Sequence, residues 1–464
     1  MVGISAYDCR IIGNRLQIKI RSERPGLNEG DLPLTRWGQW LLGPFAVAVA
    51  CAWFAVAAAL YAHLVPLGQS PDELAHLAYL RGLSQHLSLP VHTAERQQPP
   101  LYYALGAVMY RIDPNPMAIR ALSVALGVTT IMLTALAARE LWPRHPLRWL
   151  VACAFLAALP QFQFLSGSIT DDAIATTAAA LLTWLVVKVC TTHRPNDRLL
   201  AAMGASVGAA LLAKETDYFL AVILVAVSIA VWRGSMLQRG TLWLAGLPLV
   251  IAGWWFGRNL AVYHHPLPGL RPLFPHTRLR HVSQLHQWLD RTFQSFFGLF
   301  GNMSTEIQMN GHSIAIYRSL EIASVAALLL AWLALNQRWS TWSARQRTLA
   351  ATLAAIPILA GLQMLANSVL IDYQAQGRYL MVAAPTLGLM LAFALGYLGR
   401  WIPQPLQIAG AVLLIAGALV LDLAGITTVA FHLKLTGSID QAYSAGLFLL
   451  GRLAESQSHI SFVS

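Results

Sequence analysis

Long runs of uncharged apolar residues recur through this chain from residue 41 to residue 431. A helix of about 20 apolar residues is long enough to cross the hydrocarbon core of a bilayer. Lipid offers no hydrogen-bond partner to backbone N–H and C=O groups, so such runs must be helices or the strands of a closed barrel. Their length and continuous apolarity favour helices. The chain is therefore predicted to be an all-α, polytopic integral membrane protein.

The composition agrees with this fold class. Hydrophobic residues make up 56% of the 464 residues and charged residues only 11%, whereas a soluble protein has about 25% charged residues. The first 36 residues are polar and basic and lack the apolar core of a signal peptide, so the first apolar run is expected to remain as a span. The cysteines are scattered and match neither a disulfide framework nor a metal site; they are Cys9, Cys51, Cys153 and Cys190.

The apolar runs predict about eleven transmembrane helices within a domain covering residues 41–431. A basic cytoplasmic segment, residues 1–40, precedes this domain, and a short outer tail, residues 432–464, follows it. A stretch from Pro100 to Arg111 is too short to cross and is expected to form a helix at the membrane surface. The spans are expected near 41–63, 118–140, 148–165, 172–190, 198–213, 216–232, 241–257, 316–335, 348–370, 379–398 and 406–430.

The distribution of basic residues predicts the orientation. More than half of the 32 lysines and arginines fall in the segments on one side of these spans, and that side is expected to be cytoplasmic. The N-terminus is then inside a bacterial cytoplasmic membrane, and two long loops, 64–117 and 258–315, lie outside. The net charge of +11 reflects this bias and attraction to lipid headgroups, so the expected partner is the bilayer and not a nucleic acid.

Six groups of polar residues fall on the predicted outer side. Asp72 and Glu73 follow Pro71 at a helix start, where they either cap the helix or accept a proton at the membrane surface. Asp171 and Asp172 precede a span, as caps or as site residues. The remaining groups centre on Gln98 and Tyr102, on Lys214 and Glu215, on Arg258, and on Gln376, Arg378 and Tyr379.

Placing an ionisable group this close to hydrocarbon costs free energy, so these groups indicate a functional site. Two alternatives remain open: Lys214 and Glu215 pair only with each other, or Arg258 and Arg378 serve only as anchors at the membrane interface. Together the groups suit a lipid whose anionic phosphate lies at headgroup depth, because an arginine fork can bind a phosphate. The histidines of the second outer loop match no metal-site spacing. A divalent metal is compatible with the acids, but no pattern indicates one, and no cofactor is predicted.

The motifs resemble those of the GT-C glycosyltransferase superfamily. The chain looks like bacterial relatives of the dolichyl-phosphate-mannose protein mannosyltransferases and of the lipid A aminoarabinose transferase, within an uncharacterised bacterial membrane-protein family. The elements that carry the resemblance are Pro-Asp-Glu-x-x-His at Pro71–His76, Gln-Pro-Pro-Leu-Tyr-Tyr at Gln98–Tyr103, Gly-Ser-x-Thr-x-Asp at Gly167–Asp172, Trp-Trp-x-x-Arg-Asn at Trp254–Asn259, and Gln-Gly-Arg-Tyr at Gln376–Tyr379.

The resemblance implies a polyprenyl-phosphate-linked sugar as donor and a hydroxyl of a cell-envelope glycan, lipid or protein as acceptor, with transfer on the outer membrane face. Asp72 is the expected general base and Glu73 its partner. An inverting, single displacement would place the donor phosphate near Lys214, Arg258 and Arg378. The acids Asp171 and Asp172 depart from the usual Asn-Asp. Acceptor or sugar contacts are expected from His76, Gln98, Tyr102, Asp171, Asp172, Gln376 and Tyr379.

Other functions remain open at this point. A transporter or flippase for a lipid-linked sugar would use the same cationic face, an O-antigen ligase or polymerase would transfer an oligosaccharide, and an assembly subunit would catalyse nothing. The enzyme is favoured because the acids and long loops share one side, while charges in the middle of spans are scarce. Asp422 is the main exception.

Overall fold

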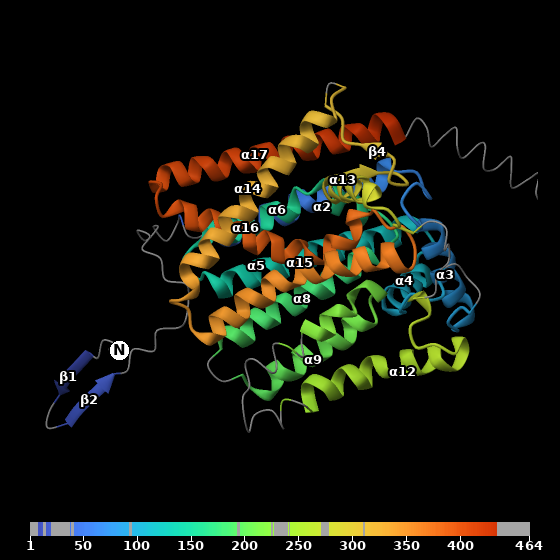
Figure 1. Cartoon of the computed structure of the whole chain (residues 1–464). Helices are drawn as coiled ribbons and strands as arrows, with labels where there is room; N and C mark the ends of the chain where they lie inside the picture. The colour runs from blue at the N-terminus through green and yellow to red at the C-terminus, as the bar shows by residue number, and fades with distance from the viewer. Residues whose placement is uncertain are drawn as a thin grey trace, which may run out of the picture.

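The computed structural model describes residues 8–12, 15–19, 41–91, 95–192, 195–223, 242–270, 278–309 and 311–433, and the single positions 38, 226 and 240. Long helices dominate and lie side by side in one bundle (Figure 1). A short antiparallel hairpin of β1 (Asp8–Ile12) and β2 (Arg15–Lys19) falls in the N-terminal segment, for which no strand was predicted.

Seven described helices are long and apolar enough to cross a membrane. They confirm the predicted all-α polytopic fold, and they match seven of the predicted spans within a few residues. They are η1–α2 (Leu41–Phe45 and Ala46–Leu64), α5 (Pro116–Leu141), α8 (Asp172–Thr191), α14 (Ile314–Trp339), α15 (Ala344–Leu370), η5–α16 (Gly377–Ala383 and Ala384–Gly399) and α17 (Gln404–Thr428), which runs on into η6 (Val429–Leu433).

The span predicted at 148–165 is broken. Helix α6 (Pro146–Ala157) and helix α7 (Pro160–Ser166) meet at a bend of 62°, because Pro160 has no N–H to continue the ladder. The carbonyl of Ala157 instead accepts a hydrogen bond from Gln163 Nε2 at 2.6 Å. An apolar solvent requires such a replacement partner for every freed backbone group.

The predicted number of eleven spans stays a prediction. Helix α9 (Asp197–Leu211) is short for a crossing. The continuous pair of η3 (Leu242–Gly246) and α12 (Leu247–Tyr263) is not among the seven candidate spans. Most of the predicted span 216–232 lies outside the described residues.

Helices α9 and α12 pack closely through two glycines spaced four apart. A Cβ on Gly204 would lie 2.0 Å from the carbonyl oxygen of Trp243, and one on Gly208 would lie 2.8 Å from the side chain of Ile251. Small residues at this spacing let membrane helices approach each other closely.

Short elements cover the end of the bundle where α2 finishes and α5 begins. They include α4, which confirms the helix predicted between Pro100 and Arg111. The long core helix α8 is the most enclosed of the candidate spans. The covering elements are α3 (Glu73–His86), α4 (Leu101–Ile112), η2 (Glu215–Asp217), η4 (Pro268–Leu270), α13 (Val282–Phe297) and the two-residue strands β3 (Leu299–Phe300) and β4 (Thr305–Glu306).

The glycine packing can be tested with a matched pair. Gly204→Ala should lower the midpoint of thermal unfolding in detergent, because the added methyl meets the Trp243 carbonyl. Gly410→Ala on α17 should leave the midpoint unchanged or raise it, because nothing lies within 4 Å of that position and alanine has a helix propensity about 1 kcal/mol better than glycine. Equal effects of the two substitutions would contradict the close approach.

Candidate functional site

Asp72 and Glu73 are neighbours in sequence but point into different surroundings. Asp72 lies at the start of α3 in the left-handed region, with φ 60° and ψ 8°, a conformation that is uncommon outside glycine and more often tolerated by Asp. Its side chain is 48% exposed, whereas that of Glu73 is fully buried. Only the first of the two carboxylates is open to an incoming molecule.

The Glu73 carboxylate is enclosed by hydrogen-bond donors. Arg120 of α5 binds it in a bidentate pair, with Nε–Oε1 at 2.9 Å and Nη2–Oε2 at 2.8 Å. The backbone N–H groups of Gly68 and Ile169 donate to its two oxygens at 2.9 and 3.0 Å. Arg120 also donates to the Ala62 and Val65 carbonyls at the end of α2. This pair therefore joins α2, α3, α5 and the turn before α8.

Asp72 forms an ion pair with Arg378, whose Nη2 lies 2.7 Å from Asp72 Oδ2. Partial burial would raise the pKa of Asp72, but the charges of Arg378, His76 and Lys214 outweigh it and lower that pKa below its ordinary value. The guanidinium is buried at the start of η5 and also donates to the hydroxyl of Tyr379 at 3.1 Å. Asp72 is thus held as a carboxylate.

A second, fully buried ion-pair group adjoins the first. Lys214 Nζ lies 2.5 Å from Asp171 Oδ1 and 2.6 Å from Asp172 Oδ1. Burial alone would lower the pKa of Lys214, but the two carboxylates raise it. Arg378 Nη1 lies 3.9 Å from Asp172 Oδ2, which links the groups into one chain of alternating charges. We call Asp72, Arg378, Asp172, Lys214 and Asp171 the charge chain.

The turn that carries Asp171 and Asp172 is fixed by hydroxyl groups. The Tyr102 hydroxyl lies 2.8 Å from Ser123 Oγ and accepts a hydrogen bond from the backbone N–H of Thr170 at 3.2 Å. Ser168 Oγ lies 2.7 Å from Ser70 Oγ, in the loop just before Asp72. These contacts hold the turn against the first loop. The positions of Asp171 and Asp172 are therefore fixed relative to Asp72 and Glu73.

Aromatic residues line the adjacent part of α3 and α4. His76 Nδ1 lies 2.7 Å from the hydroxyl of Tyr103, and the ring of Tyr103 stacks on that of Tyr79 with centroids 3.7 Å apart. All three side chains are buried. Such a stack fixes the imidazole one helical turn beyond Asp72.

The chain is similar to a known protein family and to several solved structures. A sequence model of the family "Dolichyl-phosphate-mannose-protein mannosyltransferase" matches residues 97–255. Two solved structures of ArnT from Cupriavidus metallidurans, apo and bound to undecaprenyl phosphate, superpose with TM-scores of 0.51 and 0.52 at 17% and 16% identity. The matches cover 86% and 85% of this chain and 76% and 77% of those chains. The chain has the GT-C fold.

A further solved structure shares this fold. The oligosaccharyltransferase AglB from Archaeoglobus fulgidus, in complex with an inhibitory peptide and a dolichol-phosphate, matches with a TM-score of 0.50 at 12% identity, over 84% of this chain and 56% of that chain. No curated protein matches the sequence. The predicted resemblance to GT-C enzymes is confirmed, as is a multi-pass membrane protein.

The GT-C bundle does not bring every predicted site residue into the charge chain. Arg258 donates to the Pro90 carbonyl and to Asn259 Oδ1, at 2.9 and 3.0 Å, and lies against the ring of Trp255. Among the described residues none of its hydrogen bonds reaches Asp72, Lys214 or Arg378. Gln376 Nε2 bonds to Gln374, 3.1 Å away.

Two acids at this end of the bundle, Glu95 and Asp217, were not predicted as site residues. Within the described part of the chain, both side-chain oxygens of Asp217 are buried without a hydrogen-bond partner, as are the side-chain oxygens of Gln98 and Gln376, which were predicted. Burial raises the pKa of Glu215 to about 8 and also raises that of Glu95. The described residues contain no group of three or more His, Cys, Asp and Glu placed to hold a metal ion.

The pairing of Glu73 with Arg120 leads to a stability prediction. Glu73→Gln should leave the Arg120 guanidinium buried without its counter-charge, at a cost of about 3–5 kcal/mol, and should lower the thermal midpoint in detergent. Glu321→Gln is the matched control, because its ion pair with Arg318 lies at the surface of α14 and exposed pairs contribute little. A midpoint for Glu73→Gln equal to that of the control would contradict the structural role.

Proposed function

We propose that this chain is a membrane glycosyltransferase that moves a sugar from a polyprenyl-phosphate donor to an acceptor hydroxyl. The observation that carries the proposal is the half-exposed carboxylate of Asp72, held by the buried Arg378 at one end of the bundle. The match to a mannosyltransferase family model, and the fold shared with a structure that binds undecaprenyl phosphate, support this class of donor.

The proposed reaction is a single displacement. The acceptor O–H transfers its proton to a carboxylate oxygen of Asp72 while the acceptor oxygen attacks the anomeric carbon. The bond between that carbon and the phosphate oxygen breaks, and the polyprenyl phosphate leaves with the bonding electrons. Attack opposite to the leaving group inverts the anomeric configuration. The proton then passes from Asp72 to water.

Arg378 and Lys214 would stabilise the leaving phosphate. Both cations are already in position before the donor binds, so little reorganisation is needed as charge develops. Arg378 is the better-placed contact, because one of its two acidic partners, Asp72, is half-exposed, whereas the acids on Lys214 are buried. The contacts of Arg258 with Pro90 favour a role in holding the segment after α3.

Glu73 is proposed as a positioning residue. Its oxygens accept four hydrogen bonds from protein groups, so it has little capacity left for a substrate. The buried imidazole of His76, the hydroxyl of Tyr379 and the buried amide oxygens of Gln98 and Gln376 are proposed to contact sugar or acceptor hydroxyls. Tyr102, Asp171 and Asp172 support them through the turn.

The site is proposed to face the outside of a bacterial cytoplasmic membrane. The basis is the excess of basic residues in the segments that connect the spans at the opposite end from Asp72. The first 36 residues, which are rich in arginine, would then lie in the cytoplasm.

The test is sugar transfer or hydrolysis by the purified protein in lipid, with a panel of radiolabelled polyprenyl-phosphate sugars. Asp72→Asn should reduce turnover by about a hundredfold to ten-thousandfold, because it removes the general base. Asp113→Asn in the same outer loop is the control. Activity of Asp72→Asn within a few fold of wild type would refute the assignment, and donor binding without any release by wild type would favour a transporter.

The ion pair also predicts a shift in pH dependence. The base acts as a carboxylate, so activity is present above its pKa and is lost as the pH falls through it. Because Arg378 lowers the pKa of Asp72, the acidic limb of kcat/KM in wild type should lie below the ordinary range of aspartate, near 4. Arg378→Gln should move this limb to higher pH, in addition to lowering the rate.

The measurement is a kcat/KM profile against pH for wild type and Arg378→Gln, with Arg318→Gln as a control on an exposed arginine. His76 and Lys214 also lower the pKa of Asp72 and remain in the variant, so the shift should be partial. An unchanged acidic limb would show that the titrating base is not the partner of Arg378.

A further inference from the structure

The chain reaches Arg378 through a segment without regular structure. Residues 371–376 connect α15 to η5 and form neither a helix nor a strand. At the end of this segment, the backbone N–H of Gly377 donates to Ser295 Oγ of α13 at 2.6 Å. Both residues are buried. The backbone one residue before Arg378 is therefore held by a side chain of α13.

Gly377 also lies directly against the backbone of α13. A Cβ at this position would overlap the backbone nitrogen of Phe296 and the carbonyl oxygen of Thr292. Glycine is required here because two backbones approach each other closely, and not because of a positive φ. The position of α13 therefore determines where η5 can begin.

A second contact joins α13 to the same segment through α15. Trp288 Nε1 of α13 donates to Ser368 Oγ at 2.8 Å, and the backbone N–H of Gln374 donates to the same oxygen at 3.1 Å. Trp288 and Ser295 are separated by about two helical turns, so both lie on the buried face of α13. This face holds the segment before Arg378 at two points.

The Arg378 side chain makes few bonds that could fix it by themselves. Its Nη2 donates to Asp72 and to the Tyr379 hydroxyl, and its Nη1 lies 3.9 Å from Asp172. Its buried Nε has no hydrogen-bond partner in the part of the chain that the structure describes. Arg120, in contrast, donates from all three of its nitrogens. The place of the Arg378 guanidinium therefore depends on the backbone from which the side chain extends.

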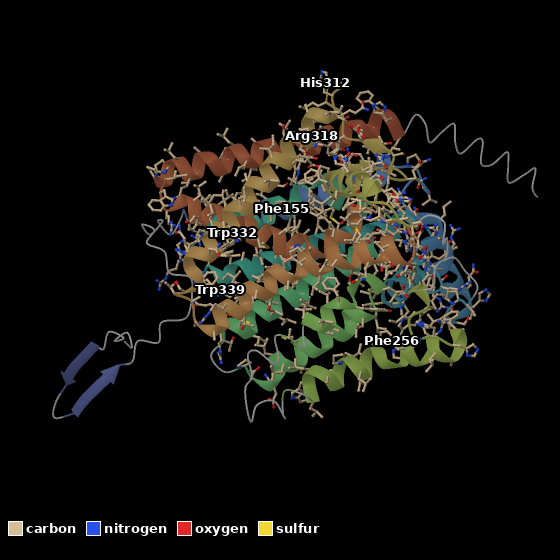
Figure 2. The ribbon with its side chains drawn as sticks, viewed as in Figure 1. Phe155, Phe256, His312, Arg318, Trp332 and Trp339 are labelled. Carbon is tan, nitrogen blue, oxygen red and sulfur yellow. The ribbon has the colours of Figure 1, made fainter. Side chains whose placement is uncertain are left out.

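Helix α13 belongs to the long loop 258–315 and lies at the same end of the bundle as α3 and α4 (Figure 1). It packs against α7 and η5. Near the end of this loop, the His312 side chain is exposed and points away from the bundle (Figure 2). The part of the loop that reaches the backbone before Arg378 is therefore α13.

We propose that Ser295 and Gly377 are positioning residues for the sugar transfer, through which α13 places the Arg378 guanidinium between Asp72 and the donor phosphate. This inference rests on the proposed function of Asp72 and Arg378. Loss of the Ser295 hydroxyl would leave the buried N–H of Gly377 without a partner, which is costly. The backbone before Arg378 would then move to find another partner, and the guanidinium would move with it.

The first test is sugar transfer by the whole chain in lipid. Ser295→Ala should lower kcat by about tenfold to a hundredfold, because a displacement of about 1 Å at a catalytic group can cost that much. Ser295→Thr keeps the hydroxyl and should retain most of the activity. Ser283→Ala, at an exposed position in the first turn of the same helix, is the matched control.

A double variant separates positioning from a general loss of packing. If the effect of Ser295→Ala passes through Arg378, adding it to Arg378→Gln should lower the rate little further. Two effects that multiply in full would contradict the proposal. The same loss of rate in Ser295→Thr as in Ser295→Ala would also contradict it, because the hydroxyl would then have no part in the effect.

The second test needs no substrate. Arg378 lowers the pKa of Asp72, together with His76 and Lys214, which remain in the variant. The Asp72 carboxyl can be followed by infrared spectroscopy, as the difference between each chain and the same chain with Asp72→Asn. A displaced Arg378 lowers this pKa less, so the carboxyl should titrate at higher pH in Ser295→Ala than in wild type.

Two further variants support this measurement. His312→Gln removes a titratable group from the exposed end of the same loop and should leave the Asp72 titration unchanged. Trp288→Phe keeps an aromatic ring but removes the N–H that binds Ser368, and it should shift the titration in the same direction as Ser295→Ala. Thermal unfolding in detergent shows which variants keep the fold, and Trp288→Phe serves if Ser295→Ala does not.

An unchanged Asp72 titration in a folded Ser295→Ala chain would overturn the proposal, whatever its activity. A shifted titration in a chain that transfers no sugar from any donor would support the coupling of α13 to Arg378 and would refute only the proposed function. The two hypotheses can therefore fail separately.

Discussion

The buried pair of Glu73 and Arg120 is the interaction on which the Asp72 end of the bundle depends. It connects the end of α2, the start of α3, the first turns of α5 and the turn at Ile169 through one carboxylate and one guanidinium. A buried ion pair adds little stability relative to a well-packed apolar pair, but breaking it is costly. Its main consequence here is geometric, because it allows one arrangement of these four segments.

That arrangement explains why two adjacent acids differ in role. The Glu73 side chain is buried against Arg120. The left-handed backbone at Asp72 turns the Asp72 side chain toward Arg378 and toward the exposed surface. The charge chain then contains three acids and two cations, and all except Asp72 are buried. A phosphate entering the site would meet carboxylates already bound to both cations. It can compete most readily at Arg378, where the half-exposed Asp72 can move aside.

The sequence was sufficient to predict the fold class and most of the long helices, because continuous apolarity is a local property. It also placed Asp72, Lys214 and Arg378 on one side, and the structure links them through Asp172. It could not predict that Arg120 would pair with Glu73, because a contact between residues 47 positions apart produces no periodic pattern in the sequence. The break at Pro160 was missed because α6 and α7 together are as apolar as one span.

Charges inside the spans would favour the transporter alternative, and Asp422 is the main such charge. The contacts of Asp422 indicate a structural role instead. Its Oδ2 accepts hydrogen bonds from Trp53 Nε1 at 2.7 Å and from Gln163 Nε2 at 2.9 Å. Gln163 is also the residue that satisfies the carbonyl freed at Ala157.

Asp422 therefore ties α17 and α2 to the bent end of α6 and to α7, which leads directly into the turn before α8. This turn is held by Asp422 through Gln163 on one side and by Glu73 through Ile169 on the other. A side chain enclosed in this way has little freedom to exchange partners as a translocation path would require. The position of Asp422 is better explained by a structural role. It helps to fix the turn from which Asp171 and Asp172 hold Lys214 beside Arg378.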